Sequence, residues 1–96
     1  MDESETISKL ERICEFCDKK FTSESILLKT LEELNELSQI IAKYLNKQIP
    51  IEIFLKKGKE EMADCLIMLF QLNISIGYTF ELREKINKIG KKFGVE

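Results

Sequence analysis

The chain has 96 residues, of which 44% are hydrophobic and 33% charged, so we expect one soluble domain spanning residues 1–96. Its formal net charge of −2 argues against a general binder of polymeric nucleic acid, which would normally show a basic surface. No apolar run reaches the ~20 residues of a membrane span, and the acidic N-terminus lacks a signal-peptide pattern, so we expect a cytoplasmic protein outside the membrane.

The first predicted helix runs from about Glu5 to about Lys20, where apolar residues recur at three- and four-residue steps. Cys14 and Cys17 within it form a C-x-x-C segment, and Cys65 is the third cysteine. A zinc site would need more nitrogen or sulfur ligands, and the chain contains no His. We therefore interpret these cysteines as small apolar residues on a helix face, and the odd count argues against a disulfide framework.

The second predicted helix runs from about Glu24 to about Asn46, and Ser23 is the expected N-cap. Its apolar positions follow the spacing of an amphipathic helix. Residues 51–59 are interpreted as a linker with a helical turn at most, because Gly58 weakens a continuous helix.

The third predicted helix runs from about Lys59 to about Ile76, with Gly77 as its C-terminal stop. From Met62 onward it is apolar on nearly every face, which is typical of a helix that is buried all round. Four short helices in one chain can hardly surround it, so we expect other copies of the chain to cover the remainder in a homo-oligomer.

Thr79 is the expected cap of the fourth helix, which runs to about Ile89, and Gly90 and Gly94 are expected to end it. The sequence shows no internal repeat and no pattern of alternating strands. It therefore predicts an all-α fold of four helices.

Two acidic motifs lie in helical sequence, and each holds carboxylates three residues apart. They are Glu32-Glu33-Leu34-Asn35-Glu36 and Glu61-Met62-Ala63-Asp64. A step of three residues advances a helix by nearly one turn, so the acids of each motif share a face. Two such helices side by side would direct four carboxylates at one point, and oxygen-rich sites of this kind hold Mg²⁺ or Mn²⁺. The motifs therefore favour chemistry on a phosphorylated small molecule.

Each motif also has a simpler interpretation. Asp64 precedes a long apolar run, so it either enters the interior, where a cation would offset the cost of burial, or sits on the rim near the helix start. The first motif could be a solvated acidic face, but leucines bracket it closely. The absence of His favours an all-carboxylate site and excludes a His general base.

Three further side chains are candidates for substrate binding. Lys85 and Lys88 lie three residues apart and could reach phosphate oxygens from one helix face, or form a solvated helix end favoured by the dipole. Gln71 lies two turns after Asp64 on the same face, so it could bind a base or sugar, or serve as a buried, hydrogen-bonded amide.

The two motifs resemble the EExxE…ExxD signature of the MazG-like, all-α nucleoside triphosphate pyrophosphohydrolases. The resemblance covers about residues 24–90 and is strongest to the short, single-domain members of phages and bacteria. It implies a MazG-like four-helix bundle, assembly as a homodimer or homotetramer, and dependence on Mg²⁺, with Mn²⁺ as a substitute. It also implies cleavage of a nucleoside triphosphate to a monophosphate and pyrophosphate, in a role such as nucleotide-pool cleaning.

The resemblance also implies roles for individual residues. The metal ligands would be Glu33, Glu36, Glu61 and Asp64. The catalytic acids would be Glu32, Glu33 and Glu36, with Glu32 orienting or deprotonating the attacking water. Lys85 would face the phosphates. Two other functions stay open: a helical module that senses Mg²⁺-nucleotide without cutting it, and a non-enzymatic module that binds a protein partner.

Overall fold

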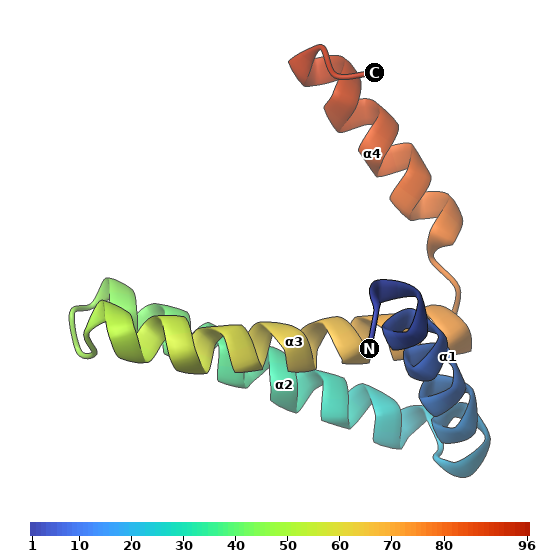
Figure 1. Ribbon diagram of the computed structural model, residues 1–96, viewed down its shortest axis with the longest axis horizontal. Coiled ribbons are helices and arrows are strands. Elements are labelled where there is room, and N and C mark those ends of the chain that lie inside the picture. Colours follow the sequence, from blue (N-terminus) through green and yellow to red (C-terminus); the bar gives the residue numbers. More distant parts are fainter.

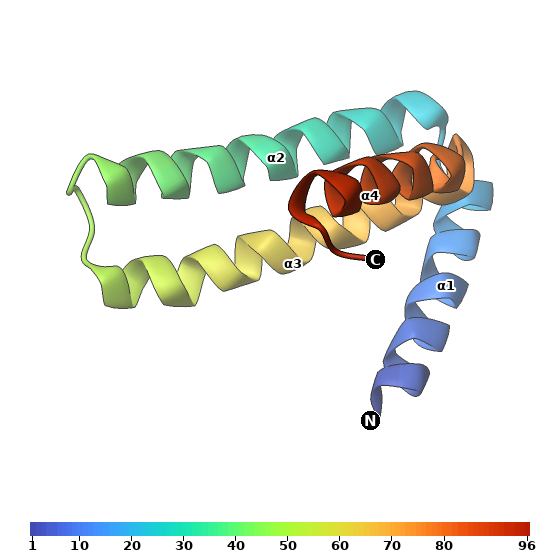
Figure 2. The same cartoon turned by 90° about the horizontal axis from the view of Figure 1, so that it is seen from above.

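The computed structural model describes residues 1–96 and consists of four helices. In chain order these are α1 (Glu3–Lys20), α2 (Ser23–Leu45), α3 (Ile51–Ser75) and α4 (Thr79–Phe93). Helices α2 and α3 lie side by side and antiparallel, and α1 crosses α3 at the end far from the α2–α3 loop (Figures 1 and 2). The chain has no strand, which confirms the all-α prediction. None of the helices combines the length and apolarity needed to cross a membrane.

The seam between α2 and α3 is the main packed region. Ile26 and Thr30 of α2 are buried there, and Cys65 of α3 donates its Sγ–H to the Glu33 carbonyl oxygen at 3.2 Å. Near the loop, the rings of Tyr44 and Phe54 stack with their centroids 4.5 Å apart. These contacts connect the two helices along most of their length and bring the two acidic motifs to the same seam.

Residues 51–59 are helical, so the prediction of a linker was wrong. Helix α3 begins at Ile51, directly after its N-cap Pro50, where the missing N–H of proline removes no helical hydrogen bond. Gly58 lies inside the helix and is buried, and a Cβ there would meet the Phe54 ring at 3.4 Å. Packing of this turn against α2 outweighs the low helix propensity of glycine, which costs about 1 kcal/mol relative to alanine.

The predicted N-caps of α2 and α4 were each wrong by one residue. The N-cap of α2 is Thr22, whose hydroxyl accepts from the Ser25 N–H at 3.1 Å, whereas Ser23 is the first helical residue. The N-cap of α4 is Tyr78, and Thr79 is again the first helical residue. Thr22 and Ser23 are both good N-cap residues, so the sequence does not choose between them at α2. At α4 the Tyr78 side chain makes no capping bond, and the Thr79 hydroxyl donates instead to Asn73 Oδ1 at 3.3 Å.

The end of α4 also lies further along the chain than predicted. Gly90 is helical and only Gly94, with φ of 70°, forms the left-handed C-cap. Its N–H bonds back to the last turn, and the Val95 N–H bonds to the Gly90 carbonyl at 2.7 Å. The predicted stop at Gly77 is confirmed, because α3 ends at Ser75 and Gly77 adopts φ of 81°.

Two hydrogen bonds hold helix α1 against α3, one from a side chain to the backbone and one between two side chains. The Gln71 amide donates from Nε2 to the Cys14 carbonyl at 2.9 Å, and the Ser75 hydroxyl donates to Asp18 Oδ1 at 2.7 Å. Cys14 is buried, Cys17 is half-buried, and all three cysteines are free thiols. The interpretation of the C-x-x-C segment as part of an apolar helix face agrees with this placement.

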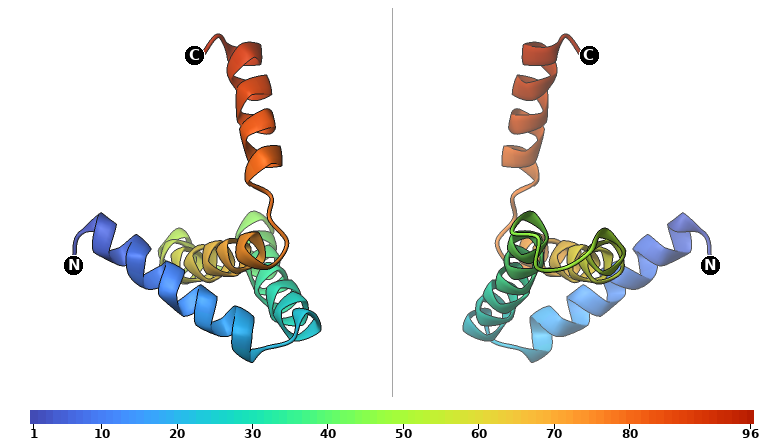
Figure 3. Two further views of the ribbon diagram at one scale, coloured as in Figure 1. Left: turned by 90° about the vertical axis from the view of Figure 1, so that its right-hand side faces the viewer. Right: turned by 90° about the vertical axis from the view of Figure 1, so that its left-hand side faces the viewer.

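Helix α4 projects away from the other three helices, on the side of the α2–α3 pair opposite α1 (Figure 3). The turn before it is well bonded: the Tyr78 hydroxyl donates to the Leu69 carbonyl at 2.6 Å, and the Tyr78 N–H donates to Asn73 Oδ1 at 2.8 Å. No residue of α4 is buried. A single chain therefore has the four helices but does not close them into a bundle.

The chain is open for its size. Its accessible surface is 7932 Å², against roughly 5,700 Å² expected for a compact chain of this mass. Its radius of gyration is 16.1 Å, against about 12.5 Å for a compact domain of this length. Only 7 of 96 residues are buried, so most large apolar side chains face outward.

Candidate metal centre

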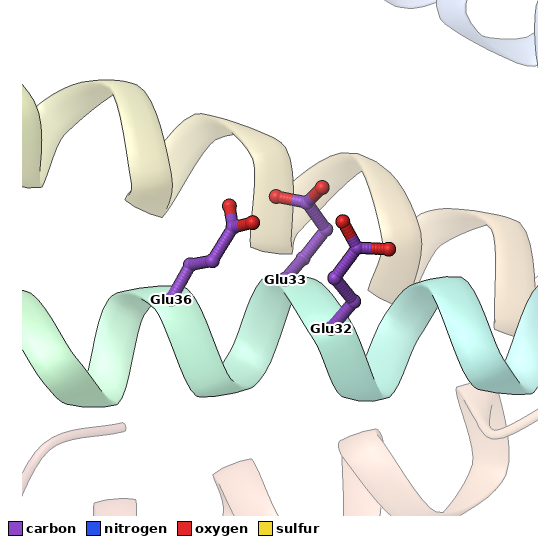
Figure 4. Close-up of side chains that lie close together, drawn as sticks. All are labelled: Glu32, Glu33 and Glu36. Atoms are coloured by element: carbon purple, nitrogen blue, oxygen red, sulfur yellow. The ribbon is translucent and has the colours of Figure 1, made fainter.

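The two acidic motifs meet at the middle of the α2–α3 seam. Glu32, Glu33 and Glu36 extend from consecutive turns of α2 toward α3 (Figure 4). Their carboxylate oxygens form one group in which all ligand atoms lie within 4.8 Å of one another. A second group of the same compactness joins Glu33 to Glu61 and Asp64 of α3. The five predicted acids thus form two overlapping groups that share Glu33.

Glu33 is the central carboxylate and is only 7% exposed. Its Oε1 pairs with Lys29, but its Oε2 is buried without a hydrogen-bond partner. Glu61 Oε2 is buried without a partner in the same way. A buried carboxylate oxygen with no partner carries a desolvation cost of about 1–3 kcal/mol or more. These two oxygens, on two facing helices, are the strongest sign that the site accommodates a cation.

Lys29 is the cation nearest to the acids. Its Nζ lies 3.1 Å from Glu33 Oε1 and 3.5 Å from Glu32 Oε1. The hydrogen bond to Glu33, together with the negative charges of both acids, raises the pKa of Lys29 above its ordinary value. One ammonium group against five acids leaves the cluster with a large negative excess, so it attracts further positive charge.

This excess also changes the protonation of the cluster. Burial raises the pKa of Glu61 above its ordinary value, and the adjacent Glu36 carboxyl and the other nearby acids raise it further. The pKa of the Cys65 thiol is raised by burial first and then by the charge of Glu33. Without a cation, Glu61 therefore binds a proton more readily than an isolated glutamate does, and the Cys65 thiol loses its proton less readily than an isolated cysteine does.

The donor set fits a hard divalent cation. Every candidate ligand is a carboxylate oxygen, and neither imidazole nor thiolate competes at the site, because Cys65 turns its Sγ–H to a backbone carbonyl. Mg²⁺ and Mn²⁺ prefer such oxygen ligands. Asp64 and Glu32 are exposed, so a cation held here would also be open to a substrate. The rim position of Asp64 matches the simpler of its two sequence interpretations, while Glu33 is the acid that is buried.

Gln71 does not belong to the acidic groups. It is buried, and its Nε2 is taken up by the Cys14 carbonyl, which corresponds to the interpretation as a buried amide. It also lines a cavity of about 470 Å³ between α1, α2 and α3. The apolar lining of this cavity includes Ile13, Cys17, Phe21, Ile26, Ile67 and Met68. Lys29 lines the same cavity and pairs with the acids, so the cavity borders the acidic cluster.

Lys85 and Lys88 are not brought to the acids within one chain. Both lie on α4, which is on the opposite side of the α2–α3 pair from α1 (Figure 3). Any role for them at the cluster would require either a different position of α4 or a second chain.

Sequence reasoning missed two residues of this site. Lys29 lies three and four residues before Glu32 and Glu33, and this spacing places it on the same helix face. That signal was readable in the sequence. The thiol of Cys65 bonds to a carbonyl 32 positions earlier in the chain, and no local pattern could have indicated this contact.

Comparisons with known proteins find no relative of the chain. No known protein family matches the chain, and no curated protein or solved structure matches it either. The likeness to MazG-like pyrophosphohydrolases therefore rests on the two acidic motifs alone.

Proposed function

We propose that this protein is a Mg²⁺-dependent pyrophosphohydrolase that converts a nucleoside triphosphate to a monophosphate and pyrophosphate. The observation that carries the proposal is the pair of unpartnered, buried carboxylate oxygens of Glu33 and Glu61, which face the same acid-rich point from two helices. A purely structural helix pair has no need of this arrangement, because it costs stability in the absence of a cation. The proposed cellular role is the removal of unwanted nucleotides.

The acids have different roles in this proposal. Glu33, Glu36, Glu61 and Asp64 would hold Mg²⁺, or Mn²⁺ in its place. Such an ion neutralises phosphate charge and stabilises the leaving pyrophosphate. Glu32 is exposed at the edge of the cluster and accepts the proton of the attacking water. Water oxygen then replaces the bridging oxygen between the α- and β-phosphates, and that bridging oxygen leaves with pyrophosphate.

The neighbouring cavity supports a substrate with an apolar, flat portion. Its apolar lining suits a nucleobase, and its volume of about 470 Å³ lies within the usual range for small-molecule sites. Lys29 stands between the cavity and the acids, where its ammonium group can contact a phosphate oxygen. Under this proposal the nucleoside occupies the cavity and the triphosphate extends over the acidic cluster.

The test is the release of pyrophosphate from a panel of ribo- and deoxyribonucleoside triphosphates, measured with Mg²⁺ and with EDTA. The proposal expects release that requires the metal, with the monophosphate as the second product. Release of orthophosphate instead would contradict the proposed bond cleavage. If no triphosphate is hydrolysed, the hydrolase proposal fails. Stabilisation of the protein by a Mg²⁺-nucleotide would then support a sensor.

A further inference from the structure

Lys29 makes both of the ion pairs in this chain. Its Nζ lies 3.1 Å from Glu33 Oε1 and 3.5 Å from Glu32 Oε1. The chain has 15 basic and 17 acidic residues, so ion pairs could have formed at many places on its surface. They are confined instead to one lysine at the edge of the acidic cluster.

Stabilisation of helix α2 does not account for these pairs. Lys29 precedes both acids in the helix, whereas a pair at this spacing stabilises a helix best when the acid comes first. The Lys29 side chain is also 52% exposed, and an exposed pair contributes about 0–1 kcal/mol. The position of Lys29 is therefore better explained by the acids than by the helix.

Glu33 is the acid that most needs a positive charge. It is buried, its Oε1 has Lys29 as its partner, and its Oε2 has none. A buried carboxylate stays ionised at an acceptable cost only when it is paired. Lys29 supplies the positive charge that partly satisfies Glu33.

Lys29 and a divalent cation would compete for this carboxylate. Glu33 belongs to both of the compact carboxylate groups, so a cation held by either group draws on the charge of Glu33. Two positive charges that share one carboxylate also repel each other at close range. Each therefore weakens the attraction of the acids for the other.

Lys29 can leave the acids without a change in the backbone. Half of its side chain is exposed, and the ammonium group sits on a flexible four-carbon stem. Lys29 also lines the cavity of about 470 Å³ between α1, α2 and α3, as does Ser25 one turn earlier in α2. The ammonium group can thus turn from Glu33 to an anionic group of a molecule that occupies the cavity.

We propose that Lys29 is a counterion that releases Glu33 when a divalent cation binds and then contacts a phosphate oxygen of the triphosphate. The contact with phosphate rests on the proposed function, whereas the exchange with the cation concerns only the acids and Lys29. Lys29 weakens the binding of the cation to the free protein and strengthens the binding of the triphosphate. The protein is therefore expected to take up the metal mainly together with the triphosphate.

Isothermal titration of Mg²⁺ into the protein without nucleotide tests the exchange. Lys29→Met keeps most of the apolar stem and removes the charge, so the affinity for Mg²⁺ is expected to rise about fivefold. Lys29→Arg keeps the charge and is expected to stay within about twofold of the wild type. Damage to the fold would weaken binding, so the sign of the change separates the two explanations. An unchanged or lower affinity in Lys29→Met would overturn the exchange.

Lys43→Met is the matched control for this titration. Lys43 lies on the same helix and is exposed, but it makes no ion pair. It follows Glu36 by seven residues, which places it about 10 Å further along the helix. Lys43→Met is expected to leave the affinity for Mg²⁺ within about twofold of the wild type. An equal rise in both variants would assign the effect to net charge and refute the specific role of Lys29.

Thermal melts cover the case in which Lys29→Met is less stable than the wild type. The variant leaves both Glu33 oxygens without a partner, so its melting temperature in EDTA is expected to fall. The same concentration of Mg²⁺ is expected to raise the melting temperature of Lys29→Met more than that of the wild type, because the variant binds the ion more tightly. An equal or smaller rise in the variant counts against the exchange.

Steady-state kinetics with the best triphosphate tests the contact with phosphate. At saturating Mg²⁺, Lys29→Met is expected to raise KM at least about 10-fold and to change kcat by less than about threefold, because a charge-assisted hydrogen bond to the substrate is lost. Lys29→Arg is expected to restore most of the KM. An unchanged KM in Lys29→Met would overturn this contact.

Failure of this inference differs from failure of the proposed function. If the wild-type protein hydrolyses triphosphates but Lys29→Met binds Mg²⁺ no more tightly, the exchange is refuted and the hydrolase remains. If the wild-type protein hydrolyses none, the proposed function and the contact with phosphate fail together. The Mg²⁺ titration then still decides whether Lys29 exchanges with the cation. If neither the wild type nor any variant binds Mg²⁺, the metal centre and the exchange are both refuted.

Discussion

The two sides of the α2–α3 pair differ in what they lack. On the acidic side, five carboxylates gather around two buried oxygens without partners, and Lys29 is the cation that pairs with them. On the other side, which we call the apolar side, ten large apolar residues of α2 and α3 are exposed: Leu27, Leu31, Leu34, Ile41, Leu45, Ile51, Leu55, Met62, Leu66 and Leu69. The acidic side therefore has the chemistry of a cation site, and the apolar side has that of a protein interface.

The difference arises because the residue before a seam position and the residue after it point to opposite sides of the helix pair. Residues directly before the seam supply acids such as Asp64, and residues directly after it supply apolar side chains such as Leu66. A single helix pair can therefore carry a polar site and an interface without conflict. The comparison predicts that substitutions on one side leave the properties of the other side unchanged.

The largest expected effect comes from removing the charge of one acid at the cluster. Asp64→Asn or Glu36→Gln should reduce metal-dependent pyrophosphate release by about 100-fold or more, because less charge remains to hold the cation that stabilises the leaving group. Helical content by circular dichroism should remain that of the wild-type protein. Steady-state kinetics at saturating Mg²⁺ provides the measurement.

Glu60→Gln is the matched control for these variants. Glu60 lies next to Glu61 in the sequence but outside both carboxylate groups. Its substitution removes the same charge and should leave the rate of pyrophosphate release within about twofold of the wild-type rate. Wild-type activity in Asp64→Asn and Glu36→Gln, or equal losses in Glu60→Gln, would refute the site assignment.

The next effect is on stability and depends on pH. Burial and the neighbouring acids raise the pKa of Glu61 in the folded protein, so the folded state holds this proton more tightly than the unfolded state does. The resulting stabilisation is complete below the ordinary carboxyl pKa and is lost as the pH rises through the raised pKa. The melting temperature in EDTA should therefore fall as the pH rises from about 4 toward neutral.

A bound cation should reverse this trend. Mg²⁺ requires the charged acids and replaces the proton, so at 100 times its dissociation constant it should add about 2.7 kcal/mol of stability at neutral pH, and less under acidic conditions. Thermal melts in EDTA and in Mg²⁺ at several pH values measure the difference. Glu61→Gln should remove its part of the pH dependence. A melting temperature that does not respond to Mg²⁺ at any pH would contradict the metal site.

Substitution of Gln71 tests whether this residue has a structural role or a role in substrate binding. Gln71→Met keeps the size of the side chain but removes the hydrogen bond from Nε2 to the Cys14 carbonyl, which should cost about 0.5–1.5 kcal/mol of unfolding free energy. Denaturant titration measures this loss. Because Nε2 is already engaged, we expect the KM for the best triphosphate to change little. A large rise in KM with unchanged stability would assign Gln71 to the substrate instead.

The sequence predicted the features that depend on local spacing. The four helices, the stop at Gly77 and the grouping of acids at three-residue steps all follow from periodicity along one chain segment. Residues 51–59 were missed because the stacking of Phe54 on Tyr44 of α2 supports a turn that its own propensity does not favour. Tertiary packing decided the structure there.

The candidate site was likewise predictable from the sequence only in part. That Glu33 would be buried and Asp64 exposed depends on how α3 lies against α2, which the motifs alone do not specify. The motifs also cannot indicate that Lys85 and Lys88 lie on the far side of the helix pair, because the direction of α4 depends on the turn at Tyr78.

The smallest expected effect is the sharpest test of the comparison between the two sides. Leu66→Glu should disrupt the homo-oligomer that the sequence predicts and yet leave the affinity for Mg²⁺ within about twofold of the wild type, because Leu66 and the acids point to opposite sides of α3. Leu66 lies two positions after Asp64 in α3, a step that turns the helix by about 200°, so the two side chains leave it in nearly opposite directions. Isothermal titration of Mg²⁺ into the folded variant measures this. If the affinity for Mg²⁺ falls in step with the loss of assembly, the two sides are coupled and another copy of the chain contributes to the metal centre. If it does not, the cluster is complete within one chain, and the apolar side serves assembly alone.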